Sequence, residues 1–166
     1  RFQKPKAGDF PAMLELFSRA REGLKLSEDA HLTPLPIDKA AASLSAILLD
    51  ESYYDFLKSM VREVGGIPVL GEAAIIPFKA RAWLDLTRQR EEGGNVDEKN
   101  IRKHRNDVAR LLQLLSQEAR YELPSSVADD MRSFVEQATA EADYDPRQFK
   151  VNMTRDDVAT RLRAAY

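Results

Sequence analysis

Residues 71–115 have the sequence GEAAIIPFKARAWLDLTRQREEGGNVDEKNIRKHRNDVARLLQLL, which predicts two amphipathic helices joined by one polar turn. In the first helix, apolar residues recur at the spacing of one buried face: Ile75, Ile76, Ala82, Trp83 and Leu86. In the second helix, the same spacing is kept by Ile101, Val108, Leu111, Leu112 and Leu115. The turn contains Gly93 and Gly94, and Asp97 is expected to cap the second helix. This helical pair decides the fold.

Lys79 and Asp107 place one ionisable group on the inner side of each predicted helix. Lys79 falls in the middle of the first apolar stripe, and Asp107 lies at the edge of the second, which His104 interrupts. A buried lysine must lose its charge or find a partner, because desolvating an unpaired ion is costly. We therefore expect Lys79 and Asp107 to pair across the helix interface. In the alternative, Lys79 extends over Trp83 into water and Asp107 pairs with a surface lysine.

The runs IIPFKARAWLDL and IRKHRNDVARLLQLL resemble the C-terminal portion of the bacterial AbiEii-type nucleotidyltransferases, the toxin halves of abortive-infection and related toxin–antitoxin systems. FPAMLELFSR and SLSAILLDESYYDFL resemble the same group, so the similarity extends from residue 1 to about residue 115. The resemblance implies that Lys79 and Asp107 are catalytic, and that Lys79 also binds the nucleotide. His104 departs from the family pattern, in which many members have an acidic residue.

The resemblance also implies a magnesium ion, with Glu15 as its ligand. In the family a third acidic residue lies on a strand, and Glu15 in LELFS is the best match. The alternative is that Glu15 lies on the solvent side of an edge strand. Such enzymes also need a Gly-Ser loop and an Asp-x-Asp pair on a strand, because carboxylates must hold the metals beside the triphosphate.

Neither of these two motifs is found in the sequence. Its one Asp-x-Asp, formed by Asp143 and Asp145, leads into Pro146 and predicts a turn. We therefore expect the chain to be the C-terminal part of a longer protein, and we expect negligible nucleotide transfer from this chain alone.

The function implied by the resemblance is transfer of a nucleotide from an NTP to an RNA or protein acceptor, with tRNA as a candidate. A toxin or phage-defence role and an antitoxin partner are implied with it. The net charge of −2 and the absence of cysteine give no global basic field and no disulfide or thiolate-zinc site. No apolar run approaches the length of a membrane span. We therefore expect a cytoplasmic protein without a DNA or membrane partner.

A non-catalytic interaction module is the alternative function. In that role a helical bundle would dock a protein partner or RNA through exposed basic faces. The residues of these faces are Arg81, Arg88, Arg90, Lys99, Arg102 and Arg105. A solvated surface is the simpler explanation of these charges, because acidic residues lie near them in the sequence.

The expected fold is α+β, with domains at residues 1–70 and 71–166. The first is a small, mostly antiparallel sheet, the remnant of a nucleotidyltransferase palm, and the second is a helical bundle. Strands are predicted at residues 1–4, 12–18 and 32–37, and Asp38 is expected to cap a helix that ends near Leu49. The resemblance implies a hairpin over residues 53–70, although residues 53–64 also match helical periodicity. The later helices are expected after Pro124 and after a capping box at Thr154 and Asp157.

Overall fold

The structure is a computed structural model that describes residues 2–3, 13–14, 16–19, 32–34 and 45–166. The described residues form an α+β protein that is mainly helical, so the expected fold class is confirmed. By its internal contacts the chain divides into two compact units, Arg1–Asp55 and Phe56–Tyr166. The boundary expected after residue 70 lies within the second of these units.

The described residues of the first unit form five short strands. β1 (Phe2–Gln3) pairs antiparallel with β2 (Met13–Leu14). β5 (Ser45–Leu49) has β3 (Leu16–Arg19) as a parallel neighbour and β4 (Leu32–Pro34) as an antiparallel neighbour. The strands predicted within residues 12–18 and 32–37 are thus present, and Pro34 lies in an edge strand, where its missing N–H is tolerated.

The helix predicted to end near Leu49 is wrong for its last residues, because Ser45–Leu49 forms β5. A short apolar run suits a strand between two neighbours as well as it suits a buried helix, so periodicity could not separate them. Residues 35–44 lie outside the described residues. Asp50, which was expected to end that helix, instead opens α1 (Glu51–Met60), where its side chain accepts a hydrogen bond from the backbone N–H of Tyr53 at 3.0 Å.

The hairpin predicted over residues 53–70 is confirmed only in its second part. Residues up to Met60 are helical, as their periodicity indicated, and the aromatic side chains of Tyr53 and Phe56 are buried. β6 (Val61–Val64) and β7 (Ile67–Leu70) then form an antiparallel hairpin. Its two-residue turn has positive φ at both glycines, which is the type I′ geometry that matches the twist of the strands.

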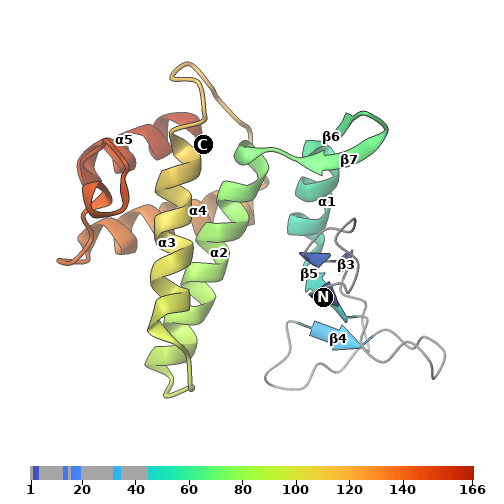
Figure 1. Ribbon diagram of the computed structural model, residues 1–166, viewed down its shortest axis with the longest axis horizontal. Helices are drawn as coiled ribbons and strands as arrows, with labels where there is room; N and C mark the ends of the chain where they lie inside the picture. Colours follow the sequence, from blue (N-terminus) through green and yellow to red (C-terminus); the bar gives the residue numbers. More distant parts are fainter. Residues whose placement is uncertain (1, 4–12, 15, 20–31, 35–44) are drawn as a thin grey trace. The chain divides into compact units, whose positions relative to one another are not determined.

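Four long helices form the rest of the second unit. They are α2 (Glu72–Glu91), α3 (Glu98–Leu112), α4 (Ser125–Ala140) and α5 (Arg155–Ala165), with a short 3-10 helix, η1 (Pro146–Phe149), before α5. Figure 1 shows α2 and α3 lying side by side along most of their length. The predicted caps are confirmed: Asp97 accepts from the N–H of Lys99 at 2.9 Å, and Thr154 and Asp157 form a capping box.

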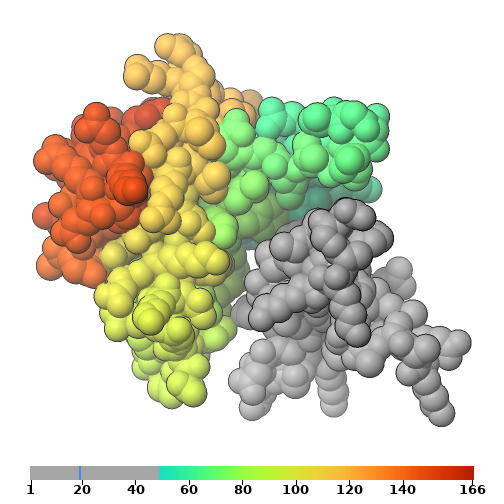
Figure 2. All heavy atoms as spheres, viewed as in Figure 1, coloured from blue at the N-terminus to red at the C-terminus, as the bar shows by residue number. Residues whose placement is uncertain are grey.

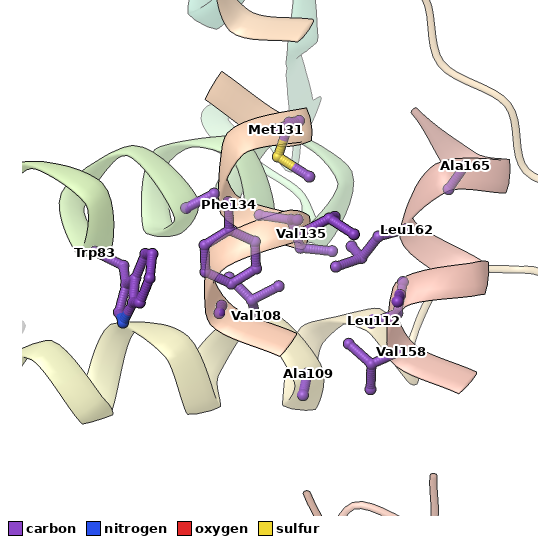
Figure 3. Packing of buried hydrophobic residues seen from close by; sticks show 14 of the residues in the cluster. Trp83, Val108, Ala109, Leu112, Met131, Phe134, Val135, Val158, Leu162 and Ala165 are labelled. Carbon is purple, nitrogen blue, oxygen red and sulfur yellow. The ribbon is translucent and has the colours of Figure 1, made fainter. Parts of the chain in front are cut away.

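The core of the second unit lies where α2, α3, α4 and α5 meet (Figure 3). Trp83 of α2 packs edge-to-face on Phe134 of α4, with ring centroids 5.4 Å apart. The buried face of α2 passes through Ile76, Trp83 and Thr87, so the predicted stripe is rotated. The reason is that α2 packs against α4 as well as α3, which the sequence of one helical pair does not show.

Pro77 lies inside α2, and the helix continues through it. Because proline has no N–H, the carbonyl of Ala73 loses its helical donor. The hydroxyl of Tyr166 donates to this carbonyl at 2.8 Å. Tyr166 also stacks on Tyr121, with ring centroids 5.6 Å apart. The side chain of Tyr166 therefore supplies the hydrogen bond to the Ala73 carbonyl that the backbone of α2 lacks.

Candidate functional site

Lys79 and Asp107 pair across the interface between α2 and α3. The Lys79 Nζ atom lies 3.0 Å from Oδ2 of Asp107, and the two side chains are 27% and 21% exposed. The predicted pairing of these two residues is confirmed. Because both side chains keep contact with water, the pair is held in place without being sealed from solvent.

A second cation completes the coordination of the Asp107 carboxylate. Nη1 of Arg110, one turn further along α3, donates to Oδ1 of Asp107 at 3.3 Å. The carboxylate thus has one cation on each oxygen, and the group of three carries a net positive charge. An excess of positive charge at a partly wet surface favours an anionic ligand over a neutral one.

His104 adds an uncharged ring to this group. It lies one turn before Asp107 on α3 and is half-buried. Burial first, and then the charge of Lys79, lower the pKa of the imidazole from 6.5 to about 4, although Asp107 acts in the opposite direction. At neutral pH His104 is therefore neutral. Within the described part of the chain its Nδ1 atom is buried without a hydrogen-bond partner.

The magnesium site implied by the resemblance is not formed by the described residues. No group of three or more His, Cys, Asp or Glu side chains among them is placed to hold a metal ion. Each oxygen of the Asp107 carboxylate accepts from a cation, Oδ2 from Lys79 and Oδ1 from Arg110. Glu15, the predicted metal ligand, lies outside the described residues.

Arg105 is the main charged residue that the sequence analysis placed wrongly. It was assigned to an exposed basic face, but its side chain is only 4% exposed. Its guanidinium donates to Glu141 and, at 3.1 Å, to Asp143, and it lies 4.7 Å from the ring centroid of Tyr144. The signal was present, because Arg105 lies four residues after Ile101 on the buried side of α3.

Arg81 also belongs to an ion-pair group. It was assigned to the solvated face of the first helix, but it bonds to Asp85 at 2.9 Å and to Asp130 of α4 at 2.7 Å. Arg81 and Arg105 are each paired with acidic side chains. They are therefore not available to the exposed basic faces on which the alternative docking function was based. The remaining exposed cations of α2 and α3 are ordinary surface charges.

The pair of Lys79 and Asp107 lies away from the hollows found on the helical unit. One shallow hollow is lined by the end of α3 and by α5, and another lies between α4 and α5.

Comparisons of the chain with protein-family models, with curated proteins and with solved structures find no match. Among the described residues, none of the helices is long and apolar enough to span a membrane.

Proposed function

We propose that this chain contributes to a nucleotidyltransferase that resembles the AbiEii type and transfers a nucleotide from an NTP to an RNA or protein acceptor. The proposal includes a cytoplasmic toxin or phage-defence role with an antitoxin partner, and a palm-like origin for the first unit. The observation that carries it is the ion pair of Lys79 and Asp107, because the resemblance implies that these two residues are catalytic and they lie together at a partly exposed surface.

Lys79 has the chemistry needed to bind a triphosphate. Its ammonium is a compact point charge with three donors, which suits phosphate oxygens. Asp107 fixes the position of this ammonium, and Arg110 offsets the negative charge of the Asp107 carboxylate. Preorganised cations stabilise the charge that moves toward the leaving group in phosphoryl chemistry.

The proposed reaction is a displacement at phosphorus. An acceptor hydroxyl attacks the α-phosphorus of the NTP, a new phosphorus–oxygen bond forms, and pyrophosphate leaves with the electrons of the broken bond. Lys79 would offset the charge of the phosphates, and Asp107 would orient Lys79. Magnesium would supply further charge stabilisation in such a reaction, and Glu15 is the one residue of this chain that we assign to it.

The test is a transfer assay with radiolabelled NTPs, magnesium and bulk tRNA or protein extract, using the protein expressed from its complete reading frame. The change Lys79→Met keeps a linear side chain of similar size, so the fold should persist. We expect transfer to fall by about a hundredfold or more, as on removal of other transition-state stabilisers.

Lys99→Met is the matched control, because it removes one exposed lysine from α3 at a distance from Asp107. The control should transfer at the rate of the unaltered protein. Equal rates for Lys79→Met and Lys99→Met would disprove the role of Lys79. Robust labelling by the 166-residue chain alone would contradict the expectation that further catalytic motifs are needed.

A further inference from the structure

Four of the five large apolar side chains that are exposed among the residues with described side chains belong to the hairpin of β6 and β7. Val64 and Ile67 are each 63% exposed, and Val61 and Val69 are also exposed. Every residue of β6 is exposed. In Figure 2 the green atoms of this hairpin lie at the surface of the second unit. A two-stranded hairpin is only marginally stable by itself in water, so an exposed apolar pair of strands calls for a cover.

Pro68 shows which edge of the hairpin is open. In an antiparallel pair, hydrogen-bonded and non-hydrogen-bonded residue pairs alternate, and residues of the second kind direct their N–H and C=O outward. Val64 and Ile67 flank the two-residue turn and form a bonded pair, so the next pair, Glu63 and Pro68, is the non-bonded kind. Pro68 has no N–H, which blocks the outer edge of β7 at its centre.

The outer edge of β6 has no such block. Glu63 directs both its N–H and its C=O away from β7, and Val61 directs its C=O the same way. Among the described strands, β6 has β7 as its single neighbour. The backbone at Glu63 is therefore the centre of an edge that can accept another strand by β-augmentation.

The charges of β6 decide against a second copy of this chain as the added strand. When two β6 strands pair antiparallel, residues whose backbone N–H and C=O groups point outward must lie opposite each other. Two registers meet this condition, one centred on Arg62 and one centred on Glu63. The first register places Arg62 opposite itself, and the second places Glu63 opposite itself. Like charges directly opposite each other destabilise a sheet, so both registers are disfavoured.

We propose that the outer edge of β6 binds an extended strand of a protein partner. Antiparallel addition favours a partner that reads apolar, basic, acidic, apolar, because the basic residue then lies opposite Glu63 and the acidic residue opposite Arg62. Arg62 also pairs with Glu72 at 3.7 Å but is 62% exposed, so it can face a second carboxylate. The acidic residue of the partner lies on the same face of the sheet as Arg62, Val64, Ile67 and Val69. The apolar residue two positions before it in the partner covers Val64. This interaction is independent of the site at Lys79.

The experiment uses random twelve-residue peptides displayed on phage, selected on the full chain. Enriched peptides should share the apolar, basic, acidic, apolar core. After synthesis, their affinities are measured for the unaltered chain, for Glu63→Pro and for Glu63→Gln. Glu63→Pro removes the outward N–H while leaving the bonds to β7, and it should weaken binding by about tenfold or more. Glu63→Gln keeps the N–H and removes the charge, and it should weaken binding by about threefold or less.

Four results would overturn the proposal. They are enrichment without the common core, unchanged affinity for Glu63→Pro, a concentration-dependent dimer that Glu63→Pro abolishes, and slow hydrogen exchange of the Glu63 amide in the monomer. The last two would assign the edge to a second copy or to the chain itself. If circular dichroism shows that Glu63→Pro is unfolded, a peptide N-methylated at the residue opposite Glu63 replaces it. That peptide should lose binding to the unaltered chain, and retained binding would contradict the proposal.

Discussion

Arg105 and Asp107 lie two residues apart on α3, and they belong to ion-pair groups of opposite character. Arg105 is 4% exposed and bonds to Glu141 and Asp143. Asp107 is 21% exposed and bonds to Lys79 of α2. The first group joins a buried guanidinium of α3 to two carboxylates of the segment that follows α4, which are 31% and 60% exposed, whereas both members of the second pair are partly exposed.

The contrast separates two uses of charge in one helix. A sealed ion must keep all its partners, because loss of one leaves a buried charge unpaired. An ion pair at a wet surface contributes little to stability, since water replaces each partner at small cost. A group of the second kind can therefore exchange its partner for a ligand, and the group around Asp107 is of this kind.

The largest expected effect is that of Arg105→Ala. Removing the buried guanidinium opens a space over Tyr144 and leaves Glu141, which is 31% exposed, without its cation. The free energy of unfolding should fall by about 3 kcal/mol, measured by urea denaturation followed through Trp83 fluorescence.

Arg102→Ala is the control for this prediction. Arg102 is exposed on the same helix and pairs with Glu98 at 3.7 Å. Its removal should lower the free energy of unfolding by less than about 0.5 kcal/mol. If both variants lose the same stability, the distinction between the sealed group and the wet group of α3 is wrong.

Arg81→Ala tests an intermediate case, because Arg81 is 38% exposed but joins α2 to Asp130 of α4. The loss should be about 1.5 kcal/mol, between the values for a sealed and a surface pair. Thermal unfolding of this variant beside Arg90→Ala, which changes an exposed arginine of α2, gives the measurement. A loss equal to that of Arg105→Ala would show that exposure does not rank these groups.

The sequence predicted the helical pair from local periodicity, and it predicted the ion pair from the apolar stripes together with the family resemblance. Lys79 and Asp107 interrupt or border apolar stripes, and two stripes that pack bring them together. The caps at Asp97 and Thr154 were predicted for the same reason, since each depends on neighbouring residues.

Features that depend on distant residues were not predicted. The partners of Arg105 come from Glu141 and Asp143, beyond a whole helix, so its burial had no local signal except its place on the stripe. Ser45–Leu49 became a strand because neighbouring strands were available to it, which a short apolar run cannot indicate. The role of Tyr166 over Pro77 likewise joins two ends of the second unit.

A double-mutant cycle measures the wet group directly. Lys79→Ala, Asp107→Ala and the double variant should give a coupling energy of about 1 kcal/mol, because both side chains remain partly hydrated. Chemical denaturation of the four proteins at one salt concentration provides the cycle. A coupling energy of about 3 kcal/mol, the size expected for a buried pair, would make the pair a structural one and would remove the support it gives to the proposed function.

The smallest expected effect concerns His104 and pH. In the folded chain burial and Lys79 lower the pKa of His104 from 6.5 to about 4, while Asp107 opposes them and Lys103 adds to them. Between these two values the unfolded chain binds a proton that the folded chain does not, so stability falls as pH is lowered through this window. The part of that loss due to His104 should be less than about 1 kcal/mol between pH 7 and pH 5, because the ring is partly exposed.

His104→Gln isolates this contribution, because it removes the imidazole and leaves every other titratable side chain in place. Urea denaturation at pH 7 and at pH 5 should show a steeper loss for the unaltered chain than for the variant. Identical losses would mean that His104 takes up its proton as readily in the folded chain as in the unfolded one. The imidazole would then carry a positive charge near pH 5 and would repel Lys79. The assignment of a neutral ring beside the pair of Lys79 and Asp107 would be wrong.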